Sequence, residues 1–240
     1  MKLLIDAGNT RIKWALLCGE EWLHLNPVPN DQAHTLSARM SHLPELQEVW
    51  VSNVAGAKIA GKIEAACKAR GWQARFIVAQ QRQCGVRNGY TVPERLGSDR
   101  WAALVAAWHR VGGAALVVNC GTATTIDALA HDGTFLGGLI LPGIALLQSS
   151  ISGAAAQLHN GPGKYAEFPL DTADAITSGA LQATCGAIQR QYQLLGDAGA
   201  PVLLGGGAAQ SVPDMLALPV RQVQDMVLQG IKLIAQEASK

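Results

Sequence analysis

A turn close to the start of the chain combines residue types that can bind a phosphate group. Its sequence is Asp6-Ala7-Gly8-Asn9-Thr10-Arg11-Ile12-Lys13. Glycine lets backbone amides come close to an anion, the Asn and Thr side chains add neutral donors, and the Arg or Lys side chain can add charge. Asp6, at the end of the preceding apolar segment, can hold a water molecule of a Mg²⁺ ion. The alternative is an ordinary β-hairpin whose polar turn faces solvent.

A second turn of the same design lies in the middle of the chain. It reads Asn119-Cys120-Gly121-Thr122-Ala123-Thr124-Thr125-Ile126-Asp127. A shift of 113 residues superposes residues 3–16 on residues 116–129 with four identical positions, a number that chance can produce. Each copy nevertheless consists of an apolar strand, a polar glycine turn and a returning strand. Two such turns, each opening a lobe, suit an enzyme that holds a triphosphate between two lobes.

A third polar cluster, Gly97-Ser98-Asp99-Arg100, stands where a helix is expected to begin. A carboxylate at a helix N-terminus stays ionised at neutral pH because the helix dipole favours it. Asp99 can therefore accept or orient the proton of a substrate hydroxyl, as in phosphoryl transfer. Arg100 offers a forked donor for a carboxylate or phosphate. The alternative is that Asp99 only caps the helix.

Two other glycine-containing segments carry weaker signals. Gly205-Gly206-Gly207 follows a strand and permits a flat backbone surface against adenine or ribose, although a tight connection explains three glycines equally well. Residues 56–62 match the first part of a P-loop, but the next residue is Ile63, which has no hydroxyl for Mg²⁺. We interpret that segment as an amphipathic helix with Ile59 and Ile63 on its buried face.

The hydrophobic pattern predicts an α/β protein in which strands and helices alternate along the chain. The expected strands span 2–6, 11–17, 49–52, 74–78, 115–119, 125–130, 134–141 and 202–204, and the expected helices about 56–70, 98–112, 143–156, 172–195 and 222–237. The pattern restarts after Gly112, and all six tryptophans lie at or before Trp108. We therefore expect an N-terminal lobe of residues 1–112 and a C-terminal lobe of residues 113–240.

Composition excludes several classes of function. The formal net charge is +1, and no Lys or Arg stands between Arg110 and Lys164, so a nucleic-acid surface is not expected. Five scattered cysteines without a CxxC pair argue against disulfides and zinc. Charged residues interrupt the apolar N-terminus, and glycines and Pro142 break the later apolar run 136–147, so neither a signal peptide nor a membrane span is expected. We expect a cytoplasmic protein.

Taken together, the ordered segments resemble the type III pantothenate kinases, which belong to the acetate and sugar kinase, Hsp70 and actin superfamily. The matching pieces are residues 6–13, Gly97-Ser98-Asp99-Arg100, Gly121-Thr122-Ala123-Thr124-Thr125 and Gly137-Gly138-Leu139-Ile140-Leu141-Pro142-Gly143. The resemblance implies two RNase H-like lobes of the actin, Hsp70 and sugar kinase type, each a mixed sheet with helices, and an active site in the cleft between them.

The resemblance also implies roles for individual residues. Residues Asp6 to Lys13 and Thr122 would bind ATP, with Asp6 near Mg²⁺. Asp99 would be the general base toward the hydroxyl of pantothenate. The substrate would be contacted by Tyr90, Gly97, Ser98, Asp99, Arg100 and Thr172. The C-terminal lobe would supply the second phosphate hairpin, the adenosine loop and dimer contacts, because the family works as a homodimer whose partner subunit helps to close the pantothenate pocket.

One residue departs from the family pattern. Many members carry Asp where this chain has Asn119, and that carboxylate helps to hold a monovalent cation. The Asn oxygen is a ligand without charge, so a requirement for K⁺ or NH₄⁺ is in doubt.

Three rival functions stay open at this point. A kinase of the same superfamily could act on a sugar, acetate or another small hydroxylated metabolite. A regulatory or accessory factor could keep the fold without catalysis. An actin-like filament protein is a more distant possibility, since this chain is short for that role.

Overall fold

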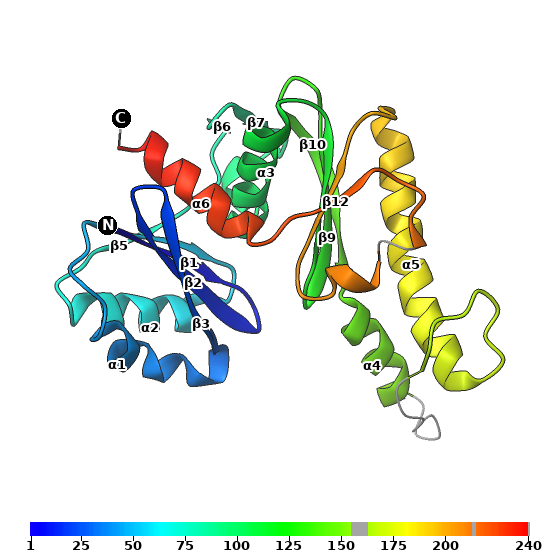
Figure 1. Ribbon diagram of the computed structural model, residues 1–240, viewed down its shortest axis with the longest axis horizontal. Helices are drawn as coiled ribbons and strands as arrows, with labels where there is room; N and C mark the ends of the chain where they lie inside the picture. The colour runs from blue at the N-terminus through cyan, green and yellow to red at the C-terminus, as the bar shows by residue number, and fades with distance from the viewer. Residues whose placement is uncertain (155–162, 213–214, 240) are drawn as a thin grey trace. The chain divides into compact units, whose positions relative to one another are not determined.

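A computed structural model describes residues 1–154, 163–212 and 215–239, and it divides into two compact units. The first unit contains Met1–Arg110 and Asp225–Lys240, and the second contains Val111–Gln224. Figure 1 shows the elements of both units in sequence colours. The expected helix 143–156 is observed as α4 (Ile144–Ala154), and its last two expected residues lie outside the described residues. Among the described helices, none has the length and apolar character that crossing a membrane requires.

The first unit is built on a mixed five-stranded sheet in the order β3-β2-β1-β4-β5. Its strands are β1 (Lys2–Ala7), β2 (Arg11–Cys18), β3 (Glu21–Pro29), β4 (Glu48–Asn53) and β5 (Ala74–Phe76). The strands β1, β2 and β3 form an antiparallel meander, and β4 and β5 extend the sheet from β1 in parallel. Both faces of β1 are apolar at its centre, where Leu3, Leu4 and Ile5 are fully buried, so helices must cover both sides of the sheet.

Alternate residues of β1 point to opposite faces of the sheet, and helices pack against both faces. The odd-numbered β1 residues Leu3 and Ile5 share one core with α1 (Leu36–Met40) and α2 (Ala57–Lys68). The opposite face contacts α6 (Met226–Glu237), which packs on β1 and β4. The unit also contains α3 (Ser98–Val111), the short hairpin of β6 (Arg82–Gln83) and β7 (Val86–Asn88), and the 3₁₀ turns Asn30–Thr35 and Pro93–Arg95.

The last helix is the main correction to the expected domain organisation. The sequence predicted a helix from about residue 222 within the C-terminal lobe, whereas α6 begins at Met226 and belongs to the first unit. Gly230 allows this placement because a side chain there would collide with the backbone carbonyl of Ala102 in α3. A contact of this kind brings two helix backbones together and joins segments that are far apart in the sequence.

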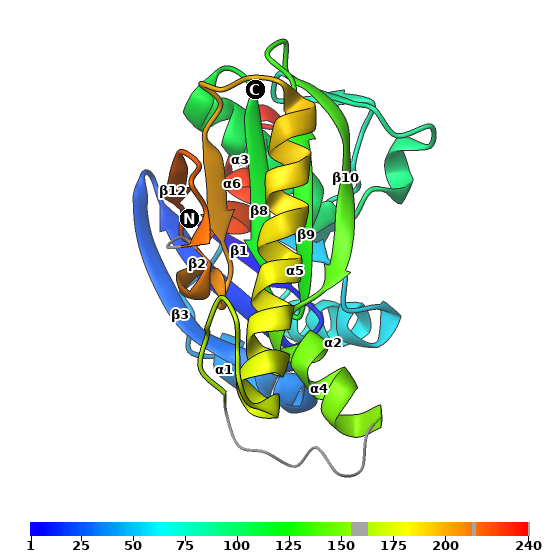
Figure 2. The same ribbon diagram turned by 90° about the vertical axis from the view of Figure 1, so that its right-hand side faces the viewer.

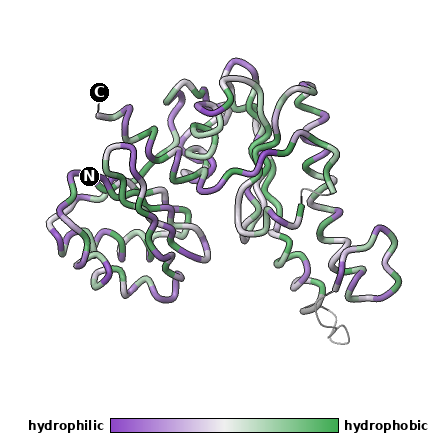
Figure 3. The backbone as a smooth tube through the Cα atoms, in the orientation of Figure 1, coloured by the Kyte–Doolittle hydropathy of each residue, from purple (hydrophilic) through white to green (hydrophobic). Residues whose placement is uncertain are grey.

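The second unit contains a mixed sheet whose strands follow the order β12-β11-β8-β9-β10. They are β8 (Ala115–Cys120), β9 (Ala123–Leu129), β10 (Thr134–Pro142), β11 (Val202–Gly205) and β12 (Val220–Gln222). Helices α4 and α5 (Thr172–Leu195) pack on β9, and Figure 2 shows α5 lying across β8 and β9. The 3₁₀ turn Ala209–Ser211 follows β11. Hydrophobic residues are concentrated along the central strands of each unit (Figure 3).

The internal repeat inferred from the sequence is confirmed by the topology of the two sheets. Shifting β1 by 113 residues gives the bounds of β8, and shifting β3 gives the bounds of β10. Each unit contains an antiparallel three-stranded meander followed by two parallel strands. The two glycine turns therefore occupy equivalent positions, each between the first two strands of its own unit.

Several elements escaped the sequence analysis. The strand β3 contains Pro27 and Pro29 and is exposed along most of its length, so it lacks the alternation of a half-buried strand. β12 is three residues long and was not predicted as a strand; only its last residue, Gln222, falls within the range expected for the last helix. In contrast, the rejected P-loop segment forms α2 with Ile59 and Ile63 buried, as predicted.

Candidate active site

The first glycine turn connects β1 to β2 and is closed by a backbone bond. The N–H of Gly8 donates to the carbonyl of Arg11 at 3.2 Å. Asn9, Thr10 and Arg11 are exposed, while Ala7 and Ile12 on either side are fully buried. The apolar flanks hold the strand ends in the core, and the polar tip projects from it. We call residues 6–13 the phosphate hairpin.

The even-numbered residues of β1 decide where Asp6 points. Asp6 shares its strand face with Lys2 and pairs in register with Lys13 of β2. Lys2 donates to the carbonyl of Ala235, so this face is the one that α6 covers. The pKa of Asp6 is raised to about 7 because its carboxyl group is withdrawn from water. Lys13 lowers that pKa, while the carboxylates of Asp99 and Asp225 raise it.

Asp225 is a functional candidate that the sequence analysis missed. Its Oδ1 atom lies 3.4 Å from Nζ of Lys13, and its Oδ2 atom lies 3.6 Å from Nδ1 of His24. The residue precedes α6 with φ 48° and ψ 37°, a left-handed conformation that Asp tolerates better than most residues. Because 212 residues separate it from Lys13, no local pattern could have linked the two.

Asp99 lies in the first turn of α3 and accepts a hydrogen bond from the N–H of Arg100 at 2.8 Å. Burial raises the pKa of its carboxyl group, an effect that this hydrogen bond and the charge of Arg100 oppose. A side chain at Gly97 would lie 2.7 Å from Oδ1 of Asp99, which favours glycine as the residue before α3. The Asp99 carboxylate thus contacts an amide of the first helical turn, and it lies near enough to the phosphate hairpin for its charge to raise the pKa of Asp6.

Ser98 anchors the start of α3 to the end of β4. Its hydroxyl group lies 2.9 Å from the hydroxyl of Ser52 and accepts the N–H of Asn53 at 3.1 Å. Both serine side chains are buried. These hydrogen bonds fix the start of α3, and with it Asp99, against the end of β4. Ser98 therefore has a structural role.

Arg100 and Tyr90 form a pair in the same unit. Nη1 of Arg100 donates to the hydroxyl of Tyr90 at 2.9 Å, and the guanidinium carbon lies 5.8 Å from the centre of the tyrosine ring. The loop that carries Tyr90 is braced by the buried Asn88, which accepts the N–H of Tyr90 and donates to the carbonyl of Pro93. Two residues predicted to contact substrate are thus brought together, although Arg100 itself is buried.

The second glycine turn is built more tightly. The N–H of Gly121 donates to the carbonyl of Ala123, and Thr122 at its tip is exposed. The loop after β11 packs against it, because the N–H of Ala208 donates to the carbonyl of Cys120. Gly206 has φ 97°, and a side chain there would lie 2.7 Å from Oδ1 of Asn119. The glycine loop therefore lies directly against the turn within the second unit.

Thr172, the remaining predicted contact, is the exposed first residue of α5. Asp171 caps that helix by accepting the N–H of Asp174 at 3.0 Å. Asp174 in turn accepts the N–H of Lys164 at 2.6 Å, so the segment before α5 is tied to its first turn. Thr172 belongs to the second unit, as do Thr122 and Asn119.

The carboxylates of the first unit fit a hard divalent cation. Asp6 of the phosphate hairpin lies near Asp99 and Asp225. Burial is the main cause of its raised pKa, and the charges of the two other carboxylates raise that pKa further. Among the described residues there is no group of three metal-binding side chains close enough to enclose an ion. Mg²⁺ does not need one, because it is commonly bound by one or two carboxylates together with water and substrate phosphates. Asp6 of the phosphate hairpin is therefore a candidate for such a site.

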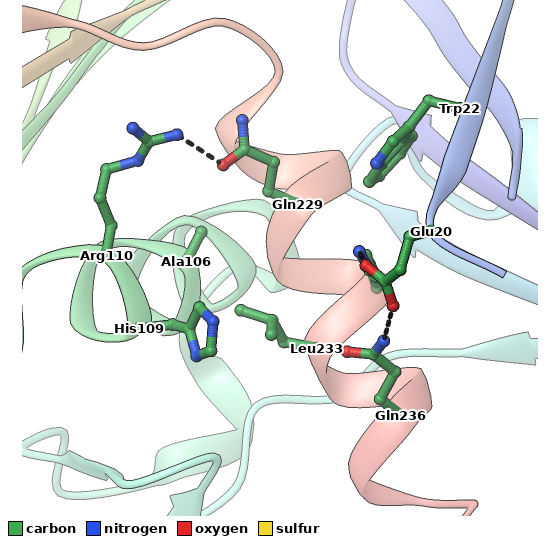
Figure 4. Close-up of a pocket in the computed structure, with 9 residues that line it drawn as sticks. Glu20, Trp22, Ala106, His109, Arg110, Gln229, Leu233 and Gln236 are labelled. Carbon is green, nitrogen blue, oxygen red and sulfur yellow. Dashed lines mark hydrogen bonds and ion pairs between the residues drawn. The ribbon is translucent and has the colours of Figure 1, made fainter.

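A separate pocket of about 480 Å³ lies between α3, α6 and the β2–β3 turn of the first unit. Figure 4 shows its lining residues, with Arg110 bonded to Gln229 and Glu20 bonded to Gln236. Lys232 forms an ion pair with Glu20 as well. None of the predicted site residues lines this pocket, and most of its charged groups contact one another, so we do not assign the chemistry to it.

Known proteins are similar to this chain over its whole length. Residues 2–194 match the family model described as type III pantothenate kinase. The type III pantothenate kinase of Aromatoleum aromaticum is 44% identical over 238 residues, which cover 99% of this chain and 98% of the relative. That of Nitrosospira multiformis is 42% identical over 241 residues, with 99% and 92% covered.

Solved structures share the fold at lower identity. A putative 2-dehydro-3-deoxygalactonokinase from Sinorhizobium meliloti has a TM-score of 0.66 at 16% identity and 98% coverage of both chains. A putative Baf family transcriptional activator from Campylobacter jejuni has a TM-score of 0.62 at 24% identity, with 99% and 98% covered. The expected α/β fold with two mixed sheets, of the sugar kinase and actin type, is confirmed. The family model and the curated relatives together identify the chain as a member of the type III pantothenate kinase family.

Proposed function

We propose that this chain transfers the γ-phosphate of ATP to the primary hydroxyl of pantothenate, which gives 4'-phosphopantothenate for coenzyme A synthesis. Family membership supports the overall reaction. The observation that supports the chemistry is the proximity of Asp99 to Asp6 and Lys13, the residue pair at the base of the phosphate hairpin. Phosphoryl transfer needs little covalent chemistry from the protein, so catalysis consists mainly of positioning and charge stabilisation.

The phosphate hairpin would bind the tail of ATP in this proposal. Its backbone amides and the side chains of Asn9 and Thr10 are donors for phosphate oxygens, while Arg11 and Lys13 supply positive charge. Asp6 would hold Mg²⁺ through a water molecule, and the bound ion would neutralise charge on the phosphates. Thr122 would bind ATP from the second unit, where the exposed tip of the tighter turn offers its hydroxyl.

Asp99 would act as the general base toward the hydroxyl of pantothenate. A base works best when its pKa is near the working pH, and burial moves the pKa of Asp99 in that direction. The oxygen that accepts the N–H of Arg100 is held in place by this bond, so the carboxylate has a fixed orientation. As the hydroxyl attacks in line with the leaving ADP, Asp99 would take its proton.

Tyr90, Gly97, Ser98, Arg100 and Thr172 would line the pantothenate site. Arg100 is suited to the carboxylate of pantothenate, because a guanidinium group binds a carboxylate with two parallel bonds. Its present bond to Tyr90 would orient it for that contact. Ser98 would contribute chiefly by holding Asp99, since its hydroxyl already contacts Ser52 and Asn53.

A homodimer is part of the proposal, and the second unit offers a surface for it. Phe168 and Leu170 are 88% and 99% exposed, and Leu146 and Ile151 of α4 are also exposed. Large apolar side chains that are exposed in this way favour contact with another protein. We also propose a cytoplasmic location, because ATP, the phosphate donor, is available there.

The decisive experiment is a coupled assay of ADP release with and without pantothenate. We expect pantothenate-dependent release, with mass spectrometry detecting the phosphorylated product. A panel of sugars, acetate and other small alcohols, assayed under the same conditions, tests the rival kinase functions. ADP release that does not depend on pantothenate, together with nucleic-acid binding in a gel-shift experiment at physiological salt, would favour the accessory-factor alternative instead.

A further inference from the structure

Asn30 binds three consecutive carbonyl groups of the phosphate hairpin. Its side-chain nitrogen donates to the carbonyl of Gly8 at 2.9 Å and to that of Asn9 at 2.8 Å. Its backbone N–H donates to the carbonyl of Thr10 at 3.0 Å. A single residue thus satisfies the acceptors along the tip of the turn.

The register of the sheet brings Asn30 to this position. The last residue pair between β2 and β3 is Arg11 with Pro29, so the residue after β3 lies beside the tip of the β1–β2 turn. Pro29 has φ −57° and ψ 146°, an extended conformation that delivers Asn30 in a defined direction. The contact therefore depends on strand pairing across about twenty residues and is invisible to a local sequence pattern.

The two carbonyls also determine which way the Asn30 amide faces. Only its nitrogen can donate, so the nitrogen must face the carbonyl oxygens of Gly8 and Asn9. Its Oδ1 atom is buried without a hydrogen-bond partner among the described residues. A buried acceptor without a partner lowers the stability of the fold, so we expect the two bonds donated by the side-chain nitrogen to have a role that offsets this cost.

Bracing the carbonyls orients the amides on the other side of the turn. All peptide bonds of the described residues are trans, and in a trans peptide the C=O and N–H groups point in opposite directions. When the carbonyls of Gly8, Asn9 and Thr10 face Asn30, the N–H groups of Asn9, Thr10 and Arg11 face away from it. Successive amides aimed to one side form a site for an anion.

The second unit solves the same problem with a different residue. The residue that follows its third strand is Gly143, which corresponds to Asn30 under the shift of 113. The N–H of Gly143 donates to the carbonyl of Thr122 at 2.8 Å. A side chain at Gly143 would collide with the carbonyl of Gly121 and would lie 2.6 Å from that of Thr122. Both turns are thus braced from the same position. In the first unit Asn30 uses its side chain and its backbone N–H, and in the second unit Gly143 uses its backbone N–H.

We propose that Asn30 is a positioning residue of the kinase: it fixes the phosphate hairpin in the conformation whose amides bind the triphosphate of ATP. The inference rests on the proposed function, because it assigns the hairpin to the nucleotide. Asn30 itself would not touch the nucleotide, since its amide is engaged on the carbonyl side.

The test compares Asn30→Ala and Asn30→Ser with the wild-type chain. Calorimetry with Mg²⁺ and the non-hydrolysable analogue AMP-PNP should show a Kd raised about tenfold in Asn30→Ala, because the hairpin loses two bonds and must be ordered by the ligand. Asn30→Ser keeps one potential donor, so its Kd for AMP-PNP should lie between those of the wild type and Asn30→Ala. KM for ATP should rise in parallel, while KM for pantothenate should stay within about twofold of wild type.

Thr35→Val is the matched control, because it also removes two side-chain hydrogen bonds from the same 3₁₀ segment but leaves the hairpin contacts in place. Thr35 donates to the carbonyl of Gln32 and accepts from Arg39. Its nucleotide Kd should equal that of wild type. An Asn30→Ala variant that folds and binds AMP-PNP as tightly as Thr35→Val contradicts the inference. An inactive wild-type chain contradicts the proposed function instead, and the Kd comparison still tests the hairpin.

Hydrogen exchange on the wild-type chain tests the inference even if the Asn30 variants do not fold. The amides of Asn9 and Thr10 should gain protection when Mg²⁺ and AMP-PNP are added, because they face the ligand. The amide of Asn30 already donates to Thr10 and should not change. Equal exchange at Asn9 and Thr10 with and without the analogue would show that the braced conformation is not the one that binds nucleotide.

Discussion

Nζ of Lys13 lies 3.4 Å from Oδ1 of Asp225, so an ion pair joins the phosphate hairpin to the residue that precedes the last helix, α6. Lys13 pairs in register with Asp6, and the charges of Lys13 and Asp225 act on the pKa of Asp6 in opposite directions. The C-terminal segment that belongs to the first unit therefore contributes, through Asp225, to the electrostatics of the site.

Asp225→Asn should lower the pKa of Asp6 from about 7. The substitution removes a neighbouring negative charge and releases Lys13 from its partner, and both changes favour the ionised form of Asp6. Asn is chosen because it tolerates the left-handed backbone of this position. Carbon-13 NMR titration of the Asp6 carboxyl group measures the shift. Asp197→Asn, which alters a loop carboxylate of the second unit, should leave the titration unchanged.

Asp99→Asn should lower kcat by about 10²–10⁴-fold while the Kd for MgAMP-PNP stays within about threefold. The amide keeps the size of the side chain and can still accept the N–H of Arg100, but it cannot take a proton. Steady-state kinetics and calorimetry separate the two quantities. Turnover close to that of wild type would reduce Asp99 to a helix cap.

Asp6→Asn should stabilise the free protein at pH 8 more than at pH 4. The folded-state pKa of about 7 lies above the ordinary value of 3.8, so the native state binds more protons between these values and its stability falls as pH rises through them. The difference between 3.8 and about 7 corresponds to about 4 kcal/mol of unfolding free energy. Urea denaturation at both pH values measures the difference. An equal gain at both would mean that the Asp6 carboxyl titrates normally.

The neutral side chain of Asn119 predicts a weak response to monovalent cations. Replacing Na⁺ by K⁺ in the assay buffer should change kcat by less than about twofold, because an amide oxygen ligates without charge. Asn119→Asp should increase the dependence on K⁺, since it adds a carboxylate beside the second glycine turn. Strong K⁺ stimulation of the unaltered chain would show that the amide oxygen suffices.

Phe168→Asp with Leu170→Asp should dissociate the proposed homodimer. Both side chains are almost fully exposed in the single chain, so the substitutions cost little folding stability and place charge where an apolar contact is expected. Sedimentation velocity on the double variant measures the mass, and circular dichroism checks its fold. A dimer that persists in the variant would put the interface elsewhere on the chain.

Local chemistry explains what could be predicted without coordinates. The bounds of α5 were predicted to the residue, because Asp171 caps the helix at its start and Gly196, in the left-handed conformation, ends it. The two glycine turns and the start of α3 are likewise encoded by neighbouring residues. The repeat was visible because equivalent strands kept equal lengths and spacing.

Contacts that span long stretches of sequence could not be predicted in this way. The role of Asn30 depends on the pairing of β3 with β2, and β3 itself lacked a recognisable strand pattern. The place of α6 depends on how closely Gly230 approaches Ala102. Such contacts follow from strand register and helix packing, and a local sequence pattern is compatible with more than one register or packing.

The sequence by itself determined the type of fold and the family, and it predicted candidate residues for binding phosphate and accepting a proton, because each of these depends on short segments of neighbouring residues. Only the tertiary structure decided that Asp225 pairs with Lys13, that Asp6 is withdrawn from water among other carboxylates, and that Asn30 braces the turn. The physical reason is that pKa values and turn orientation depend on distances between side chains, which strand register and helix packing set.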